Sequence, residues 1–288
     1  MNSLSDCYTL YNGVQVPCVA FGTWKMPNEV VEDAVACALT TGYRHIDTAA
    51  AYQNEVGVGA GLRKSGVSRQ DIFLVSKLPN DDHGYKNAIA SCERSLQRLG
   101  VDYLDGYLIH WPVLVENQDH LEEDLCDTWR AMEQLYKDGK VRAIGTSNFL
   151  EEHIDLLKAD FADYPMINQV QMHPQCPQEE MIAYCKKNKI LPAAWSPLIQ
   201  GQAFKRELLI ETAKKYGVSV AQLCIRWIFQ KGAVPVPKSA TPERIQNNAD
   251  IFGFTISDED MENIATLRKY GMIGNPPSVP RTHQVVGF

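Results

Sequence analysis

The segment Ile72–His110 reads IFLVSKLPNDDHGYKNAIASCERSLQRLGVDYLDGYLIH. It begins with one short apolar run, Ile72–Lys77, and ends with another, Leu104–His110. Between these runs, Asn87–Leu99 places apolar residues at the spacing of an amphipathic helix. A strand, a helix and a second strand in this order predict two parallel strands joined by a crossover helix.

The same alternation continues on both sides of this segment. Leu125–Tyr136 has helical spacing as well. A strand is expected at each of eight segments: Cys18–Gly22, Tyr43–Asp47, Ile72–Lys77, Leu104–His110, Val141–Ser147, Ile167–Gln171, Leu191–Trp195 and Val234–Lys238. Eight such units favour a closed (β/α)8 TIM barrel over an open sheet, and about 250 residues are typical of one. We therefore expect residues 1–288 to form a single α/β barrel domain.

Three further elements are expected outside this repeat. In Tyr8–Val16, alternating residues flank Asn12-Gly13, a strong signal for an N-terminal β-hairpin. Ser257–Leu267 is expected to form an extra C-terminal helix, and Tyr270–Phe288, rich in Pro and Gly, reads as a loop.

Composition narrows the classes of partner. The net charge of −7 argues against nucleic acid or an anionic membrane, since both favour a basic surface. The eight cysteines form no CxxC pattern, which fits reduced thiols, and Met1–Leu10 lacks the features of a signal peptide. No apolar run reaches 18 residues, and the histidines His45, His110 and His173 have no metal-type spacing. We expect a cytoplasmic protein with no metal site.

Polar side chains lie where the predicted strands end. In a parallel barrel the carboxyl ends of all strands meet at one mouth, where function is placed. The residues expected there are Asp47, Lys77, His110, Ser147, Asn148, Gln169, Trp195, Lys238 and Ser239, with Tyr52 in the loop after Asp47. One or two such residues could be structural, but the repetition predicts a polar ring around one site.

Four of these residues suit the reduction of a carbonyl group. Hydride addition leaves negative charge on the carbonyl oxygen, which a nearby proton donor must neutralise. Tyr52 can donate, and the Lys77 ammonium is expected to lower its pKa. Asp47 would keep Lys77 protonated, and His110 would orient the carbonyl. Taken singly, a loop tyrosine, an Asp–Lys pair and a histidine are more often structural; their convergence favours catalysis.

Long motifs point to a known family. They are FGTWKMP (21–27), GYRHIDTA (42–49), AYQNE (51–55), SKL (76–78), YLIHWP (107–112), AIGTSNF (143–149), NQVQMHP (168–174), AWSPL (194–198) and VPKSATPERI (236–245). With them, nearly the whole chain resembles the aldo-keto reductase family. It is similar to the bacterial-type members, a group that includes diketogluconate reductases.

The resemblance implies a role for each matching residue. Tyr52, Asp47, Lys77 and His110 match the catalytic tetrad, with Tyr52 as the general acid. The implied cofactor is NADPH or NADP⁺, with contacts at Thr23, Ser147, Asn148, Gln169, Trp195, Ser196, Leu198, Lys238, Ser239, Thr241, Arg244 and Asn248. Within this set, Lys238, Ser239, Thr241 and Arg244 match the site for the adenosine 2′-phosphate, and basic residues near a helix N-terminus favour a phosphate on physical grounds too. Trp24, Trp111 and His110 match the substrate pocket.

Some positions depart from the family pattern. Pro79 stands where many relatives have Trp, Gln171 replaces a frequent Glu, and Asn247 replaces an adenine-contacting Glu. The glycines of residues 57–61 do not fit the GxGxxG spacing and lie inside a helical segment, so they predict close helix packing rather than a dinucleotide loop.

Three functions remain open at this point. The first is an NADPH-dependent reductase of small aldehydes or ketones, expected as a monomer. The second is an NADPH-binding regulatory or structural protein, like the potassium-channel β subunits that the resemblance includes. The third is a hydrolase on the same fold, which needs a metal cluster or carboxylate pair that does not stand out here. Turnover of NADPH with a panel of carbonyl compounds separates the first two.

Overall fold

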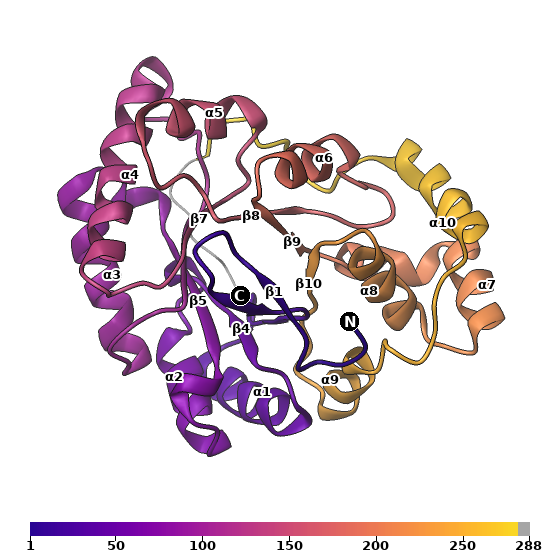
Figure 1. Ribbon diagram of the computed structural model, residues 1–288. Coiled ribbons are helices and arrows are strands. Elements are labelled where there is room, and N and C mark those ends of the chain that lie inside the picture. The colour runs from indigo at the N-terminus through magenta and orange to yellow at the C-terminus, as the bar shows by residue number, and fades with distance from the viewer. Residues whose placement is uncertain (282–288) are drawn as a thin grey trace.

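Eight parallel strands form the centre of the protein. The computed structural model describes residues 1–281. The strands pair in the order β10-β9-β8-β7-β6-β5-β4-β3. Their bounds are Phe21–Gly22 (β3), His45–Asp47 (β4), Phe73–Leu78 (β5), Gly106–Ile109 (β6), Ile144–Ser147 (β7), Ile167–Gln171 (β8), Leu191–Trp195 (β9) and Val234–Val236 (β10). Figure 1 shows the helices arranged around them.

Backbone hydrogen bonds join the first and last strands of the sheet. Ala20 N donates to Pro235 O at 3.0 Å, and Gly22 N donates to Pro237 O at 2.9 Å. These bonds close the sheet into a barrel, as the eight-unit repeat predicts. Each predicted segment holds a strand, although β3 is three residues shorter than Cys18–Gly22 because ladder pairing begins only at Phe21.

Helices follow the strands and cover the outside of the barrel. Their bounds are Asn28–Thr41 (α1), Glu55–Ser65 (α2), Tyr85–Leu99 (α3), Leu121–Lys137 (α4), Glu151–Asp160 (α5), Glu179–Lys187 (α6), Val220–Gln230 (α8) and Pro242–Ala249 (α9). The predicted helices Asn87–Leu99 and Leu125–Tyr136 are confirmed as α3 and α4, and both begin earlier than predicted. Pro242 occupies the first turn of α9, where a missing N–H is tolerated.

Two helices lie beyond the eightfold repeat. The predicted extra helix is confirmed as α10 (Asp258–Ala265), which continues as a 3-10 turn at Thr266–Tyr270. The helix α7 (Glu207–Tyr216) lies in the connection between β9 and β10 in addition to α8, and it ends at Gly217, which has a left-handed conformation. Leu209 of α7, Leu223 of α8 and Ile264 of α10 belong to one buried cluster, so these helices pack together beside the barrel.

The predicted N-terminal hairpin closes one end of the barrel. It consists of β1 (Cys7–Thr9) and β2 (Gln15–Pro17), with Tyr8 opposite Val16. Pro17 O lies 3.2 Å from Nδ1 of His45, the first residue of β4. Because His45 begins its strand, the hairpin covers the amino ends of the strands and leaves the carboxyl ends free.

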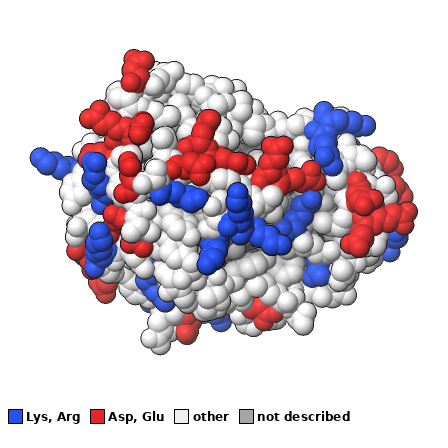
Figure 2. Space-filling view, turned by 45° about the horizontal axis from the view of Figure 1, so that its top comes forward, with Lys and Arg blue, Asp and Glu red and all other residues white. Residues whose placement is uncertain are grey.

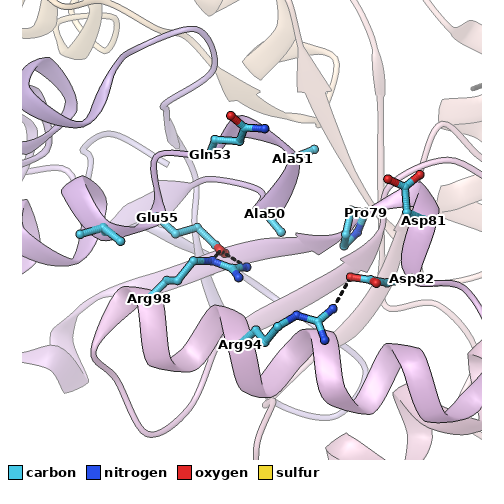
Figure 3. A pocket seen from close by; sticks show the side chains of 10 residues that line it. Ala50, Ala51, Gln53, Glu55, Pro79, Asp81, Asp82, Arg94 and Arg98 are labelled. Carbon is cyan, nitrogen blue, oxygen red and sulfur yellow. Dashed lines mark hydrogen bonds and ion pairs between the residues drawn. The ribbon is translucent and has the colours of Figure 1, made fainter. Parts of the chain in front are cut away.

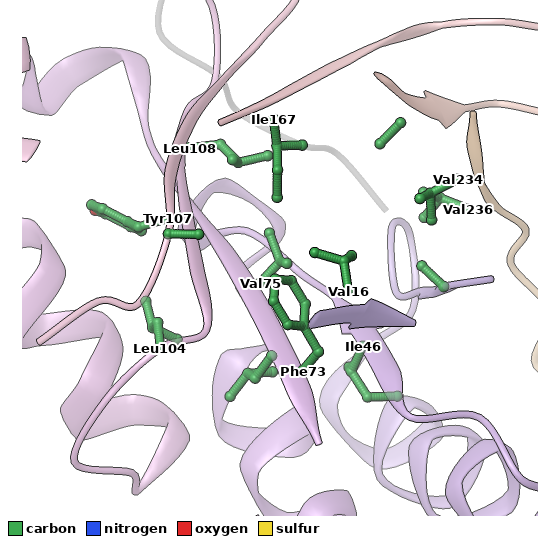
Figure 4. Packing of buried hydrophobic residues seen from close by; sticks show 14 of the residues in the cluster. Val16, Ile46, Phe73, Val75, Leu104, Tyr107, Leu108, Ile167, Val234 and Val236 are labelled. Atoms are coloured by element: carbon green, nitrogen blue, oxygen red, sulfur yellow. The ribbon is translucent and has the colours of Figure 1, made fainter. Parts of the chain in front are cut away.

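Side-chain alternation along β5 explains why a lysine points into the barrel. Phe73 and Val75 lie among the apolar side chains of the barrel in Figure 4. Ser76, between Val75 and Lys77, faces outward and donates to Glu55 of α2 at 2.6 Å. Since successive side chains alternate, Lys77 shares the inner face with the two apolar residues. The barrel is thus apolar inside and ends in a charged layer.

The glycines of α2 serve helix packing, as predicted. A Cβ added to Gly61 would lie 2.6 Å from Glu32 O of α1. A Cβ on Gly57 or Gly59 would meet the backbone at Asn28 or Leu99 even more closely. These positions therefore need glycine because neighbouring backbones approach α2 directly.

Charged side chains are mixed on the face drawn in Figure 2, where acidic and basic patches lie side by side rather than as one continuous basic surface. Within residues 1–281, no helix has both the length and the hydropathy needed to cross a bilayer.

Candidate active site

A lysine, an aspartate and a tyrosine meet at the carboxyl end of β4 and β5. Lys77 Nζ lies 2.7 Å from Asp47 Oδ1 and 3.4 Å from the hydroxyl of Tyr52, and it donates to Thr48 O at 2.9 Å. Tyr52 is carried by the 3-10 turn Ala50–Tyr52 that follows β4. The Lys77 side chain is completely buried. The predicted grouping of the three residues at one mouth is therefore present.

Burial and the nearby lysine shift the pKa of the Tyr52 phenol in opposite directions. Burial raises the pKa of Tyr52 above its ordinary value of 10.0, and the lowering effect of Lys77 only partly offsets this. Burial lowers the pKa of Lys77, but the negative charge of Asp47 outweighs it, and the net direction is upward. The predicted lowering effect of Lys77 on the Tyr52 pKa is present, but burial outweighs it and the net direction is upward. Tyr52 stays protonated at neutral pH, the form that a proton donor needs.

His110 completes the cluster from the end of β6. Its ring centroid lies 5.8 Å from that of Tyr52, with the planes at 72°. Burial first, and then the nearby Lys77, hold the pKa of His110 well below its usual 6.5. The imidazole is therefore neutral, so one ring nitrogen can donate a hydrogen bond without carrying charge. Nδ1 is buried and has no partner among the described residues.

A second hydrogen-bond network runs from β7 to β9. Ser147 Oγ donates to Gln169 O at 2.9 Å, and Asn148 Nδ2 donates to His110 O at 3.0 Å. Trp195 Nε1 donates to Asn148 Oδ1 at 2.9 Å. Gln169 Nε2 donates to Asp47 Oδ2 at 2.6 Å, which uses one of its two amide N–H groups. Gln169 thus links this network to the Asp47–Lys77 ion pair, and this bond was not predicted from the sequence.

Sequence reasoning missed two residues that fix the loop of Tyr52. Asn54 Nδ2 donates to Thr23 O and to Met26 O, both at 2.9 Å, and Asn54 Oδ1 accepts from Thr48 Oγ1. Thr23, a predicted cofactor residue, is buried and donates from Oγ1 to Asp47 O at 3.0 Å. The available signals in the sequence were the position of Asn54 in the AYQNE motif and that of Thr48 in the GYRHIDTA motif.

Basic side chains gather where β10 ends. Lys238 follows β10, and burial together with the positive charge of Lys25 lowers its pKa. Ser239 Oγ accepts from Thr241 N at 3.1 Å. The side chain of Thr241 makes no cap bond to α9, and Arg244 lies exposed in the first turn of that helix. Positive charges beside a helix N-terminus form a setting that favours a phosphate.

The loop after β9 holds the remaining predicted cofactor residues. Ser196 has φ 59°, and the nearby Ile199 has φ 56°, a left-handed conformation that is strained for a β-branched residue. Leu198 between them is half-buried, and Asn248 of α9 is buried. Strain of this kind is common at functional sites.

The two predicted substrate-pocket tryptophans are both half-buried. Lys25 Nζ lies 4.6 Å from the ring centroid of Trp24. The guanidinium carbon of Arg281 lies 3.9 Å from the ring centroid of Trp111. Arg281 was not predicted, although it is the only Lys, Arg, Asp or Glu between Tyr270 and Phe288. A single charged residue in an otherwise uncharged segment was the feature of the sequence that could have pointed to Arg281.

A cavity of about 360 Å³ lies behind the Tyr52 loop rather than at the tetrad (Figure 3). Ala50, Ala51 and Pro79 line it. Its arginines are paired, Arg94 with Asp82 and Arg98 with Glu55, both at 2.6 Å. The tetrad side chains are absent from the residues that line it, and both of its arginines are paired with carboxylates, so we place the candidate site at the barrel mouth.

The fold and this cluster define a (β/α)8-barrel protein with a proton donor, an ion pair and a neutral imidazole at its mouth. Residues 19–269 match the Aldo/keto reductase family. The chain is 48% identical over 276 residues to the glyoxal reductase of Bacillus subtilis, covering 96% of this chain and 97% of that protein. The chain therefore belongs to the aldo/keto reductase family and is an oxidoreductase.

Solved structures similar to this one belong to the same family. An aldo-keto reductase from a Medee basin deep-sea metagenome library has a TM-score of 0.90 and 37% identity, covering 95% of this chain and 99% of that one. An aldo-keto reductase of Bombyx mori, solved in complex with NADP, has a TM-score of 0.86 and 32% identity, covering 93% and 94%.

Proposed function

We propose that this protein reduces small aldehydes or ketones to alcohols with NADPH, using Tyr52 as the general acid. The observation that carries the proposal is the buried contact between the Tyr52 hydroxyl and Lys77 Nζ, which is itself held by Asp47. The dicarbonyl named for the Bacillus relative supports a small, reactive aldehyde as substrate. Comparing kcat/KM over a carbonyl panel, with NADPH and with NADH, tests the proposal.

Each residue has a part in the proposed reaction. When bound, NADPH supplies the hydride. The neutral His110 donates a hydrogen bond to the carbonyl oxygen and orients it toward Tyr52. Tyr52 transfers its phenolic proton to that oxygen as negative charge develops there. The ammonium of Lys77 then stabilises the phenolate, and Asp47 keeps that ammonium charged and in place.

The residues around the mouth fit the cofactor. The half-buried indole of Trp195 offers a flat face for the nicotinamide, and the polar groups of Ser147, Asn148 and Gln169 lie next to it along the barrel rim. Lys238 and Arg244 would hold the 2′-phosphate at the start of α9. The finer resemblance to diketogluconate reductases, the cytoplasmic location and the monomeric state stay predictions.

The proposed roles predict a flat pH profile for carbonyl reduction. Reduction needs the protonated phenol, so activity is lost only as the pH rises through the raised pKa of Tyr52. It also needs neutral His110, so activity is lost only as the pH falls through a pKa well below 6.5. We expect kcat at saturating NADPH to vary little between about pH 6 and 9. An inflection within that range would contradict this assignment of protonation states.

Lys238→Met tests the phosphate site. We expect the KM for NADPH to rise about ten-fold, because a charge-assisted contact to the 2′-phosphate is lost. The KM for NADH, which lacks that phosphate, should change little. Lys231→Met is the control, since Lys231 is paired with Glu179 and is not one of the predicted cofactor residues. An equal rise in the KM for NADPH and for NADH would show that Lys238 does not bind the 2′-phosphate.

A further inference from the structure

The end of the described chain is fixed against the loop that follows His110. Arg281 N donates to Val113 O at 3.1 Å, and Val115 N donates to Arg281 O at 2.9 Å. That loop is itself held by Asn117, whose Oδ1 accepts from Leu114 N at 2.8 Å and whose Nδ2 donates to Pro112 O at 3.1 Å. The backbone of Arg281 is therefore held at a defined position beside the barrel mouth.

Within residues 1–281, the charged side chain of Arg281 has no counterion. Its guanidinium stacks on Trp111 at 3.9 Å and donates from Nη2 to Asn275 O at 2.7 Å. Nε is buried and unpartnered, and within residues 1–281 no carboxylate forms an ion pair with the group. Burial lowers the pKa of Arg281, and no acidic neighbour raises it. A half-buried cation in this state gains from any anion that reaches it.

Trp111 links this charge to the proposed reaction centre. Trp111, on which it stacks, directly follows His110, and the His110 ring is 5.8 Å from that of Tyr52. Nη2 uses one of its two N–H groups on Asn275 O, and Nη1 makes no hydrogen bond within the described residues, so N–H groups on these two nitrogens can pair with a planar carboxylate through two hydrogen bonds. We propose that Arg281 selects carbonyl substrates that carry a carboxylate, such as oxo acids and carboxylated aldehydes. The proposal rests on the carbonyl-reducing function above.

The cavity in Figure 3 provides a contrast. Arg94 and Arg98 there are each paired with an acidic side chain, so neither offers an uncompensated charge to a ligand. Arg281 differs from them in lacking such a partner among the described residues. Because of this difference, we assign anion recognition to Arg281 beside Trp111 and not to the arginines of the cavity.

The test compares substrates that differ in charge but hardly in shape. 4-Carboxybenzaldehyde and 4-nitrobenzaldehyde have planar substituents of similar size, and only the first is an anion; the 2- and 3-carboxy isomers sample other distances. We expect Arg281→Met to lower kcat/KM for at least one carboxylated isomer about ten-fold and to leave the nitro compound nearly unchanged. Added salt should weaken turnover of the anion selectively in the wild type.

Two further variants complete the design. Arg281→Lys keeps the charge but loses the planar edge, and we expect it to retain part of the preference. Arg268→Met is the matched control, because this arginine pairs with Glu179 instead. An equal loss on charged and neutral aldehydes, or no salt dependence in the wild type, overturns the proposal.

A binding measurement separates this proposal from the proposed function. Calorimetry compares benzoate with benzamide on the NADP⁺-loaded protein, wild type and Arg281→Met. Tighter binding of benzoate that disappears in Arg281→Met supports the anion site even if no aldehyde is turned over, a result that would refute only the reductase function. Equal binding of the two compounds by the wild type refutes the anion site.

Discussion

Tyr52→Phe should lower kcat for carbonyl reduction by on the order of 10²–10⁴, the usual contribution of a general acid. The phenol is the one proton donor in contact with the Lys77 ammonium among the described residues, at 3.4 Å. Phenylalanine keeps the ring, which packs against His110, and removes only the hydroxyl. NADPH affinity, measured by calorimetry, should be unchanged. Stopped-flow loss of NADPH absorbance gives the rate of the chemical step.

Tyr85→Phe is the control for this change. Tyr85 is exposed at the start of α3 and is not one of the predicted site residues, so its loss should leave kcat as in the wild type. Turnover of Tyr52→Phe at the wild-type rate would remove Tyr52 from the mechanism. A loss of NADPH binding would assign the tyrosine to cofactor binding instead.

Lys77→Met should reduce both stability and activity. The change leaves Asp47 buried without its cation, and breaking a buried ion pair from one side lowers the free energy of unfolding by about 3–5 kcal/mol. Because Gln169 still donates to Asp47, we expect the lower end of this range. The phenolate that forms when Tyr52 donates its proton also loses its stabilising charge, so kcat falls too. Urea unfolding and steady-state kinetics measure the two effects.

The double variant Lys77→Met with Asp47→Asn separates the effect on stability from the effect on activity. Asparagine removes the uncompensated charge at nearly constant shape, so most of the lost stability should return while activity stays low. Recovery of activity in the double variant would mean that the ammonium acts only by holding the fold. A single variant as stable as the wild type would contradict the burial of the pair.

The strand-end residues could be predicted because periodicity fixes which positions share the mouth. Asp47, Lys77 and His110 each end a segment whose apolar pattern marks a strand, and the parallel barrel brings such ends together. Tyr52 lies in a loop without periodicity and was predicted from the need for a proton donor beside the carbonyl oxygen; the family motifs assign the same residue. The single domain over residues 1–288 and the individual roles of the site residues stay predictions.

Other features depend on contacts between distant segments. The helix α7 is additional to the strand–helix repeat, and its place depends on packing against α8 and α10. The bond from Gln169 to Asp47 joins residues 122 positions apart, and the net pKa of Tyr52 depends on how burial compares with one nearby charge. The loop predicted for Tyr270–Phe288 is described as far as Arg281, and residues 282–288 lie outside the described residues.

The most direct test of the central claim is NADPH oxidation by the wild-type protein over a panel of carbonyl compounds, with the alcohol quantified in the same reaction. The account predicts that small aldehydes such as methylglyoxal or an aromatic aldehyde consume NADPH and yield one alcohol for each NADPH oxidised. Tight NADPH binding with no turnover of any member of the panel would contradict it and favour a regulatory role for the bound cofactor.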